Sequence, residues 1–98
     1  MTITKKQNGS ALTVCVEGRL DTVTAPDLEK EIAAVADSVN ELTVDFAKLD
    51  YISSAGLRVL LSTHKNFAKK GGMTITNVNE TVMDIFDVTG FKDILTIK

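Results

Sequence analysis

The chain has 98 residues, 44% of them hydrophobic, which suits one globular domain and leaves little room for a second. The formal net charge of −2 argues against nucleic acid as the main partner, because binding to a phosphate backbone needs a strong basic excess. No apolar run approaches the roughly 20 residues of a membrane span, and residues 1–10 lack the apolar stretch of a signal peptide. Cys15 is the single cysteine, so an internal disulfide cannot form. We therefore expect one domain over residues 1–98, cytoplasmic, away from membranes, and needing neither metal nor cofactor.

The first elements along the chain are two predicted strands. Residues 2–5 suit a short edge strand, and Asn8-Gly9 is a typical hairpin turn. Apolar and polar residues then alternate over residues 12–17, which predicts a second strand that ends at Gly18. Cys15 lies in this run, where we expect it to be a small buried residue.

A first helix is predicted to begin at Thr24. Thr24 is a typical N-cap residue, Pro26 lies within the first turn, and Asp27 is placed as in a capping box. Apolar residues recur at helical spacing up to Val39, so the helix should end near Asn40.

A strand, a loop and a second helix follow. Residues 41–46 form a short β-rich run, and residues 47–52 are predicted to be a loop. The next helix should run from residue 53 to about residue 69 and stop at Gly71-Gly72. Its predicted apolar stripe consists of Leu57, Leu60, Leu61, His64 and Ala68.

The last third of the chain predicts a strand over residues 73–76, a helix capped by Asn79 and closed by Gly90, and a strand over residues 94–97. The fold class is therefore α/β: a mixed sheet of four or five strands with about three helices, mainly on one face. Helices on both faces remain possible at this stage. The predicted core contains Leu28, Ile32, Val44, Phe46, Leu57, Leu60 and Leu61.

Ser53 and Ser54 lie where the second helix begins. The first helical turn has free backbone N–H groups and a partial positive charge, so a phosphate on Ser54 would be favoured there. Serine is also a preferred N-cap residue, so its presence at a helix start can be explained by capping alone. Local chemistry alone does not decide between the two roles.

The segment DYISSAGLRVLL at residues 50–61 resembles the phosphorylation-site region of the STAS-domain anti-sigma factor antagonists, also called anti-anti-sigma factors. Matching Gly56 and Leu57 to the family places the phosphoacceptor at Ser54 and the usual small residue at Ala55. Ser53 departs from the family's acidic residue. Residues 17–25 and 82–91 are also similar to the family, so the resemblance covers nearly the whole chain.

The resemblance implies a partner switch without catalysis by the chain itself. The unphosphorylated antagonist binds a serine-kinase anti-sigma factor and releases the sigma factor. The kinase phosphorylates Ser54, and a PP2C-type serine phosphatase restores the active form. A monomer suffices for this role. The alternative is a STAS subunit or regulator of a transporter or stress-sensing scaffold that works without phosphorylation.

The expected partner surface combines two segments of the chain. Asp21 and Thr22 would lie on it according to the resemblance, although Asp21 could equally cap its own turn. Arg58 follows Ser54 by one helical turn and could contact the partner, the phosphate or only solvent. The expected partner-binding residues are Asp21, Thr22, Ser53, Ser54, Ala55, Gly56 and Arg58. An exposed flank of the helix should carry Ser54, Arg58, Ser62, Lys65 and Lys69.

A serine hydrolase is the alternative from the enzyme class, and the sequence argues against it. His64 is the only histidine and lies roughly 15 Å along the helix from Ser54, too far to act as its base. The glycine two residues before the serine of a nucleophile elbow is also missing, because Ile52 stands there.

Overall fold

Five strands and three α-helices alternate along the chain after an opening hairpin. The computed structural model describes all residues, 1–98. The elements are β1 (Thr2–Asn8), β2 (Ala11–Leu20), α1 (Ala25–Val35), β3 (Glu41–Ile52), α2 (Ser54–Ala68), β4 (Met73–Thr76), α3 (Glu80–Thr89) and β5 (Thr96–Ile97). Short 3₁₀ turns cover Ala36–Ser38 and Phe91–Asp93. No helix is both long enough and apolar enough to cross a bilayer.

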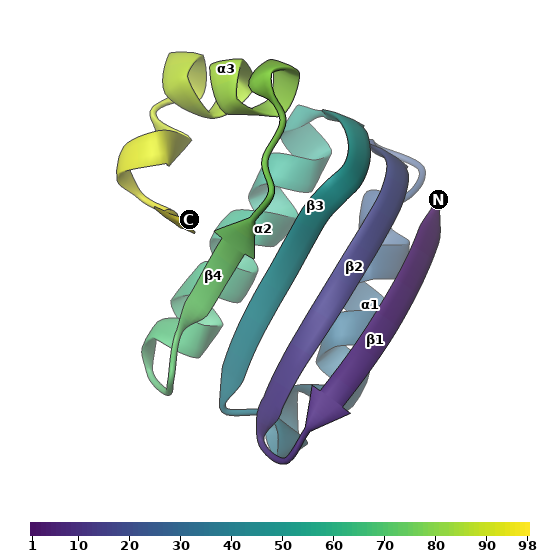
Figure 1. Ribbon diagram of the computed structural model, residues 1–98, viewed down its shortest axis with the longest axis vertical. Helices are drawn as coiled ribbons and strands as arrows, with labels where there is room; N and C mark the ends of the chain where they lie inside the picture. The colour runs from purple at the N-terminus through teal and green to yellow at the C-terminus, as the bar shows by residue number, and fades with distance from the viewer.

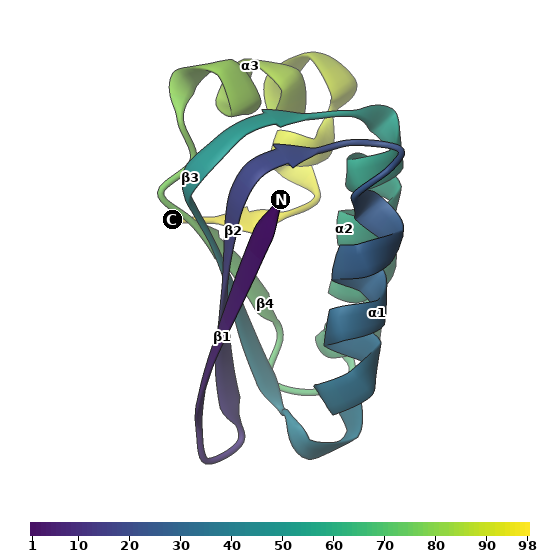
Figure 2. The same ribbon diagram turned by 90° about the vertical axis from the view of Figure 1, so that its right-hand side faces the viewer.

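The strands lie in the sheet in the same order as in the sequence, β1-β2-β3-β4-β5. β1 pairs with β2 antiparallel, and all other neighbours are parallel. α1 and α2 lie side by side on one face of the sheet, and α3 lies across the end toward which β4 runs (Figures 1 and 2). The opposite face has no helix on it. The predicted mixed α/β fold with helices mainly on one face is confirmed.

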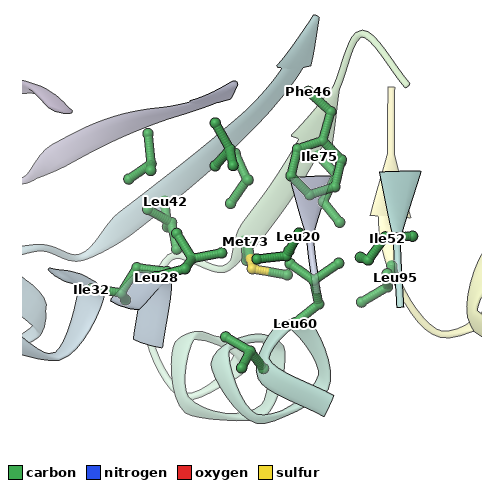
Figure 3. Packing of buried hydrophobic residues seen from close by; sticks show 14 of the residues in the cluster. Leu20, Leu28, Ile32, Leu42, Phe46, Ile52, Leu60, Met73, Ile75 and Leu95 are labelled. Carbon is green, nitrogen blue, oxygen red and sulfur yellow. The ribbon is translucent and has the colours of Figure 1, made fainter. Parts of the chain in front are cut away.

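The core lies between the sheet and the two helices α1 and α2. Leu42 and Phe46 of β3, Leu28 of α1 and Leu60 of α2 point into the same layer (Figure 3). These side chains are buried because alternate residues of a strand face the same side. Among the predicted core residues, only Leu61 is half-buried and not fully buried.

The helical stripe of α2 is rotated from the predicted one. Gly56, Val59, Thr63 and Phe67 are buried, whereas Ala68 is exposed and His64 is half-buried. The predictions of Leu61 as a core residue and of Ala68 as part of the apolar stripe are therefore wrong, whereas Leu57 and Leu60 are buried as expected. Gly56, Val59, Thr63 and Phe67 recur at spacings of three and four, and together with Leu57 and Leu60 they form the buried side of the helix.

The predicted loop over residues 47–52 is also wrong, because β3 continues to Ile52. Cys15 pairs with Asp45, but Glu17 pairs with Lys48, so β3 has one extra residue at this point. Such a bulge interrupts the alternation of buried and exposed residues. The extension matters for the site, since it leads directly into α2.

Several chain boundaries agree with the sequence, and others shift. Asn79 caps α3 by accepting a hydrogen bond from the backbone N–H of Val82 (2.8 Å), and Gly90 ends the helix in a left-handed conformation (φ 81°). α1 ends at Val35, earlier than expected. β5 is shorter than predicted, because the preceding residues form a 3₁₀ turn. Cys15 is half-buried, outside the core.

Candidate functional site

Ser53 forms the junction between β3 and α2. Its backbone is extended (φ −98°, ψ 176°), and its N–H donates to the carbonyl of Leu20 in β2 (2.8 Å). Its carbonyl accepts the first hydrogen bond of the helix from Leu57 N–H (3.0 Å). The predicted N-cap position is thus confirmed, but the hydroxyl makes no capping bond. Ser53 Oγ is instead buried and has no hydrogen-bond partner.

Ser54 is the first residue of α2, and it is exposed. The backbone N–H groups of Ser54, Ala55 and Gly56 lie in the first turn of the helix, where no carbonyl of the helix can accept from them. No other backbone carbonyl accepts a hydrogen bond from them. The positive end of the helix dipole lies at the same place. An anion attached to Ser54 would therefore meet unpaired donors without disturbing the helix.

Gly56 lets α2 approach the sheet closely. It is buried, and a Cβ atom at this position would lie 2.8 Å from Leu20 Cγ and 2.8 Å from Ile52 Cγ1. Both distances are far shorter than a carbon–carbon contact of about 3.5–4.0 Å. Gly56 therefore lies beneath the site and sets the position of the first turn of α2.

The turn before α1 is held by Asp21 and Thr24. The Asp21 carboxylate accepts hydrogen bonds from the backbone N–H groups of Val23 (3.0 Å) and Thr24 (3.1 Å). Thr24 Oγ1 accepts from the backbone N–H of Asp21 (2.8 Å). A capping box therefore exists, but it runs from Asp21 to Thr24, one turn before the predicted pair of Thr24 and Asp27. The expectation that Thr24 caps through its side chain is wrong.

These hydrogen bonds also affect the charge of Asp21. The pKa of the Asp21 carboxyl is lowered, first by the hydrogen bond from the backbone N–H of Thr24 and also by those from the Thr24 hydroxyl and the Val23 N–H. Desolvation raises this pKa, but by less than the Thr24 N–H lowers it. Asp21 is therefore a negatively charged residue at neutral pH. The capping role suggested by the sequence is present, and contact with a partner stays a prediction.

A groove separates the beginnings of α1 and α2. Thr22 and Glu29 line it from the α1 side, and Ala55, Arg58 and Ser62 line it from α2. The fold thus brings Thr22, Ala55 and Arg58 together, although Thr22 is more than thirty positions from the other two in the sequence. The whole predicted flank of α2 from Ser54 to Lys69 is exposed at its expected positions.

Val23 is a surface residue of this region that was not predicted from the sequence. Its side chain is 81% exposed. The signal available in the sequence was a valine flanked by Asp21-Thr22 and Thr24, outside any apolar periodicity. A single exposed valine is ordinary on a protein surface, but Val23 lies next to Thr22, which lines the groove.

No group of three His, Cys, Asp or Glu side chains is placed to hold a metal ion. A second hollow lies on the open face of the sheet and includes Cys15 and Asp45. The pKa of the Asp45 carboxyl is lowered, first by the side-chain amide of Asn77 (3.0 Å) and then by Ala47 N–H. Asp45 therefore anchors the segment after β4.

Comparisons with known proteins place this geometry in a family. The family model of the STAS domain matches residues 2–98. The anti-sigma-B factor antagonist of Bacillus subtilis (strain 168) is 33% identical over 93 residues, which cover 94% of this chain and 85% of the relative.

Solved structures agree with the sequence comparisons. An anti-sigma factor antagonist from Mycobacterium paratuberculosis superposes with a TM-score of 0.86 at 29% identity, over 98% of this chain and 83% of that chain. The Bacillus cell fate determinant SpoIIAA in its phosphorylated form shares the fold, with a TM-score of 0.76 at 15% identity over 99% of this chain and 91% of that chain. Because the family model matches nearly the whole chain, and the relatives share both its sequence and its fold, the chain belongs to the STAS domain family of anti-sigma factor antagonists.

Proposed function

We propose that this protein is a phosphorylation-controlled antagonist of a serine-kinase anti-sigma factor. The unphosphorylated form binds the kinase and releases the sigma factor, and phosphorylation of Ser54 ends the binding. A PP2C-type serine phosphatase removes the phosphate. The protein itself catalyses no step, and residues 1–98 act as one monomeric STAS domain in the cytoplasm.

The observation that carries the proposal is the contrast between two neighbouring serines. Ser54 is exposed on the first turn of α2, whereas the hydroxyl oxygen of Ser53 is buried. A kinase must place the attacking hydroxyl in line with the γ-phosphate, so only Ser54 is accessible without unfolding the junction. This supports Ser54 as the acceptor despite the serine in the family's acidic position.

The surrounding residues support a surface that recognises a partner through shape and charge. Asp21 and Thr22 form the turn on one side, Ala55 and Arg58 lie on the other, and Ser53 and Gly56 position the helix between them. A phosphate on Ser54 adds roughly −1.5 to −2 charge at neutral pH. Because the first turn of α2 tolerates an anion, the fold is retained while the charge of the binding surface changes. Such a change of charge at an interface lowers the affinity for a partner whose surface is complementary to the unphosphorylated form.

The test uses a purified cognate serine-kinase anti-sigma factor, with Mg-ATP. We expect one phosphate per chain, located on Ser54 by peptide mass mapping, none on Ser54→Ala, and full labelling of the matched control Ser53→Ala. Ser54→Ala should fold and bind the kinase, and Ser54→Asp should bind more weakly than wild type. Aspartate carries one charge, so its effect is smaller than that of the phosphate.

Two results would contradict the proposal. One is a phosphate that maps to Ser53. The other is equal affinity of the kinase for the phosphorylated and unphosphorylated chains, which would favour the alternative of a STAS module that regulates a transporter or scaffold without phosphorylation.

A further inference from the structure

Arg58 is a charged residue without a partner inside the protein. It is exposed and lines the groove together with Glu29, yet the two form no ion pair, since the salt bridge of this chain joins Lys5 and Glu31. The other arginine, Arg19, stacks on the ring of Tyr51 at 4.5 Å. The Arg58 guanidinium is therefore free to bind an anion from outside the fold or from its own helix.

The position of Arg58 on α2 directs it toward Ser54. The two residues are four positions apart and so are neighbours on the helix surface. Side chains of a helix lean toward its N-terminus, so that a residue covers the turn preceding its own Cα. From this position the guanidinium can reach the first turn, where a phosphate on Ser54 would be held. Its planar donors match both carboxylate and phosphate in a two-bond arrangement.

We propose that Arg58 exchanges one anion for another when the switch operates, an inference that rests on the proposed function. In the unphosphorylated protein, Arg58 binds a carboxylate that the kinase inserts into the groove between α1 and α2. In the phosphorylated protein, Arg58 pairs with the phosphate on Ser54 of its own chain. Phosphorylation then weakens the complex in two ways, by repelling the acidic contact of the kinase and by withdrawing the cation that bound it.

The first experiment measures the contact without the kinase. Phosphoserine is installed at position 54 during synthesis, and its second ionisation is followed by ³¹P NMR in wild type, Arg58→Ala and Lys65→Ala. Lys65 is the matched control, because it removes one positive charge from the same flank at roughly 16 Å from Ser54. Glu29, which lines the groove, and Asp21, in the turn before α1, are unchanged in all three proteins.

We expect the phosphate to titrate about 0.3–0.7 pH units higher in Arg58→Ala than in wild type, the size of an exposed ion pair. Lys65→Ala should titrate like wild type. Equal midpoints in wild type and Arg58→Ala would overturn the exchange, even if the kinase labels Ser54 as proposed. Conversely, a shifted midpoint without kinase labelling of Ser54 would support the contact and reject the function.

The second experiment measures the exchange itself by calorimetry with the kinase. Unphosphorylated Arg58→Ala should bind about tenfold more weakly than wild type, while Lys65→Ala changes little. The Kd of the phosphorylated protein divided by the Kd of the unphosphorylated protein should be several-fold smaller in Arg58→Ala than in wild type. The variant has no cation at position 58 that the phosphate could withdraw from the kinase. An unchanged ratio would show that phosphorylation acts by repulsion alone and would reject the exchange.

Discussion

Asp21 and Thr24 hold each other at both ends: the Thr24 backbone N–H donates to the Asp21 carboxylate over 3.1 Å, and the Asp21 backbone N–H donates to Thr24 Oγ1 over 2.8 Å. This reciprocal pair fixes the turn that carries Thr22 into the groove. Because the hydrogen bonds favour the ionised carboxylate, the pKa of Asp21 in the folded protein lies below its ordinary value. The stabilisation is therefore present above the unfolded pKa, about 3.9, and is lost as the pH falls through the lower folded value.

The first prediction concerns Asp21→Asn, which keeps the acceptor oxygen and removes the charge. At pH 7 this variant should melt below wild type and above Asp21→Ala, which removes the acceptor as well. The difference between wild type and Asp21→Asn should shrink below pH 4. Thermal denaturation from pH 7 to pH 2.5 measures it. A difference that stays constant over this range would mean that the carboxylate charge does not stabilise the turn.

The second prediction concerns Gly56→Ala in α2. Alanine normally stabilises a helix interior relative to glycine by about 1 kcal/mol. Here the new Cβ would press on Leu20 and Ile52, and overpacking of this kind costs about 1–3 kcal/mol. We expect net destabilisation in urea denaturation and weaker binding of the kinase proposed above, since the first turn must move outward. Ser62→Ala, on the exposed side of the same helix, is the control for stability, and its free energy of unfolding should be close to that of wild type. A stabilised Gly56→Ala would contradict the close approach.

The third prediction separates Leu60 from Leu61. Leu60 is fully buried, whereas Leu61 is half-buried. Leu60→Ala should lower the free energy of unfolding by about 2–5 kcal/mol, and Leu61→Ala should cost clearly less. Both are measured by denaturant unfolding under the same conditions. Equal losses would show that the helix is rotated toward the stripe expected from the sequence.

The fourth prediction concerns Lys70, which connects the ends of two helices. Its ammonium group donates to the carbonyls of Ala36 (2.6 Å) and Val39 (3.0 Å) and lies 4.8 Å from the Phe67 ring centre. Lys70→Ala should cost about 1 kcal/mol, the net worth of such a bond. Lys69→Ala removes the same charge from the neighbouring exposed position and should change stability by less than about 0.5 kcal/mol. Similar losses in both variants would assign the effect to net charge.

The sequence predicted the order of elements well because that order depends on strong local signals. The cap at Asn79 and the stop at Gly90 each require a particular residue type, and both are found where expected. The hairpin predicted from Asn8-Gly9 also forms, with Gly9 and Ser10 as its two turn residues. The expectations that are wrong depend on long-range packing. The bulge after Asp45 is decided by pairing with β2 and leaves Ala47 and Lys48 exposed in succession. Because two exposed residues in succession interrupt the alternation typical of a strand, the sequence of this segment alone predicts a loop.

The segment that carries the site could be predicted from the sequence, but the surface that the folded site presents could not. The two serines at the start of α2 were recognisable from Gly56-Leu57, but only the structure distinguishes a buried Ser53 hydroxyl from an exposed Ser54. The capping box could have begun at Asp21 or at Thr24, since both positions have a suitable residue three places on. The groove lined by Thr22 and Arg58 arises from the packing of α1 against α2, which has no counterpart in local spacing.

The strand order has a consequence for how the protein is made. Each strand pairs only with its immediate neighbours in the chain, so no strand must wait for a distant partner. During translation, β1, β2 and β3 can assemble before β4 has left the ribosome, and α2 can then settle on them. β5, with only two paired residues, comes last. The segment bearing Ser54 can therefore acquire its neighbours in β2 and β3 without waiting for the final third of the chain.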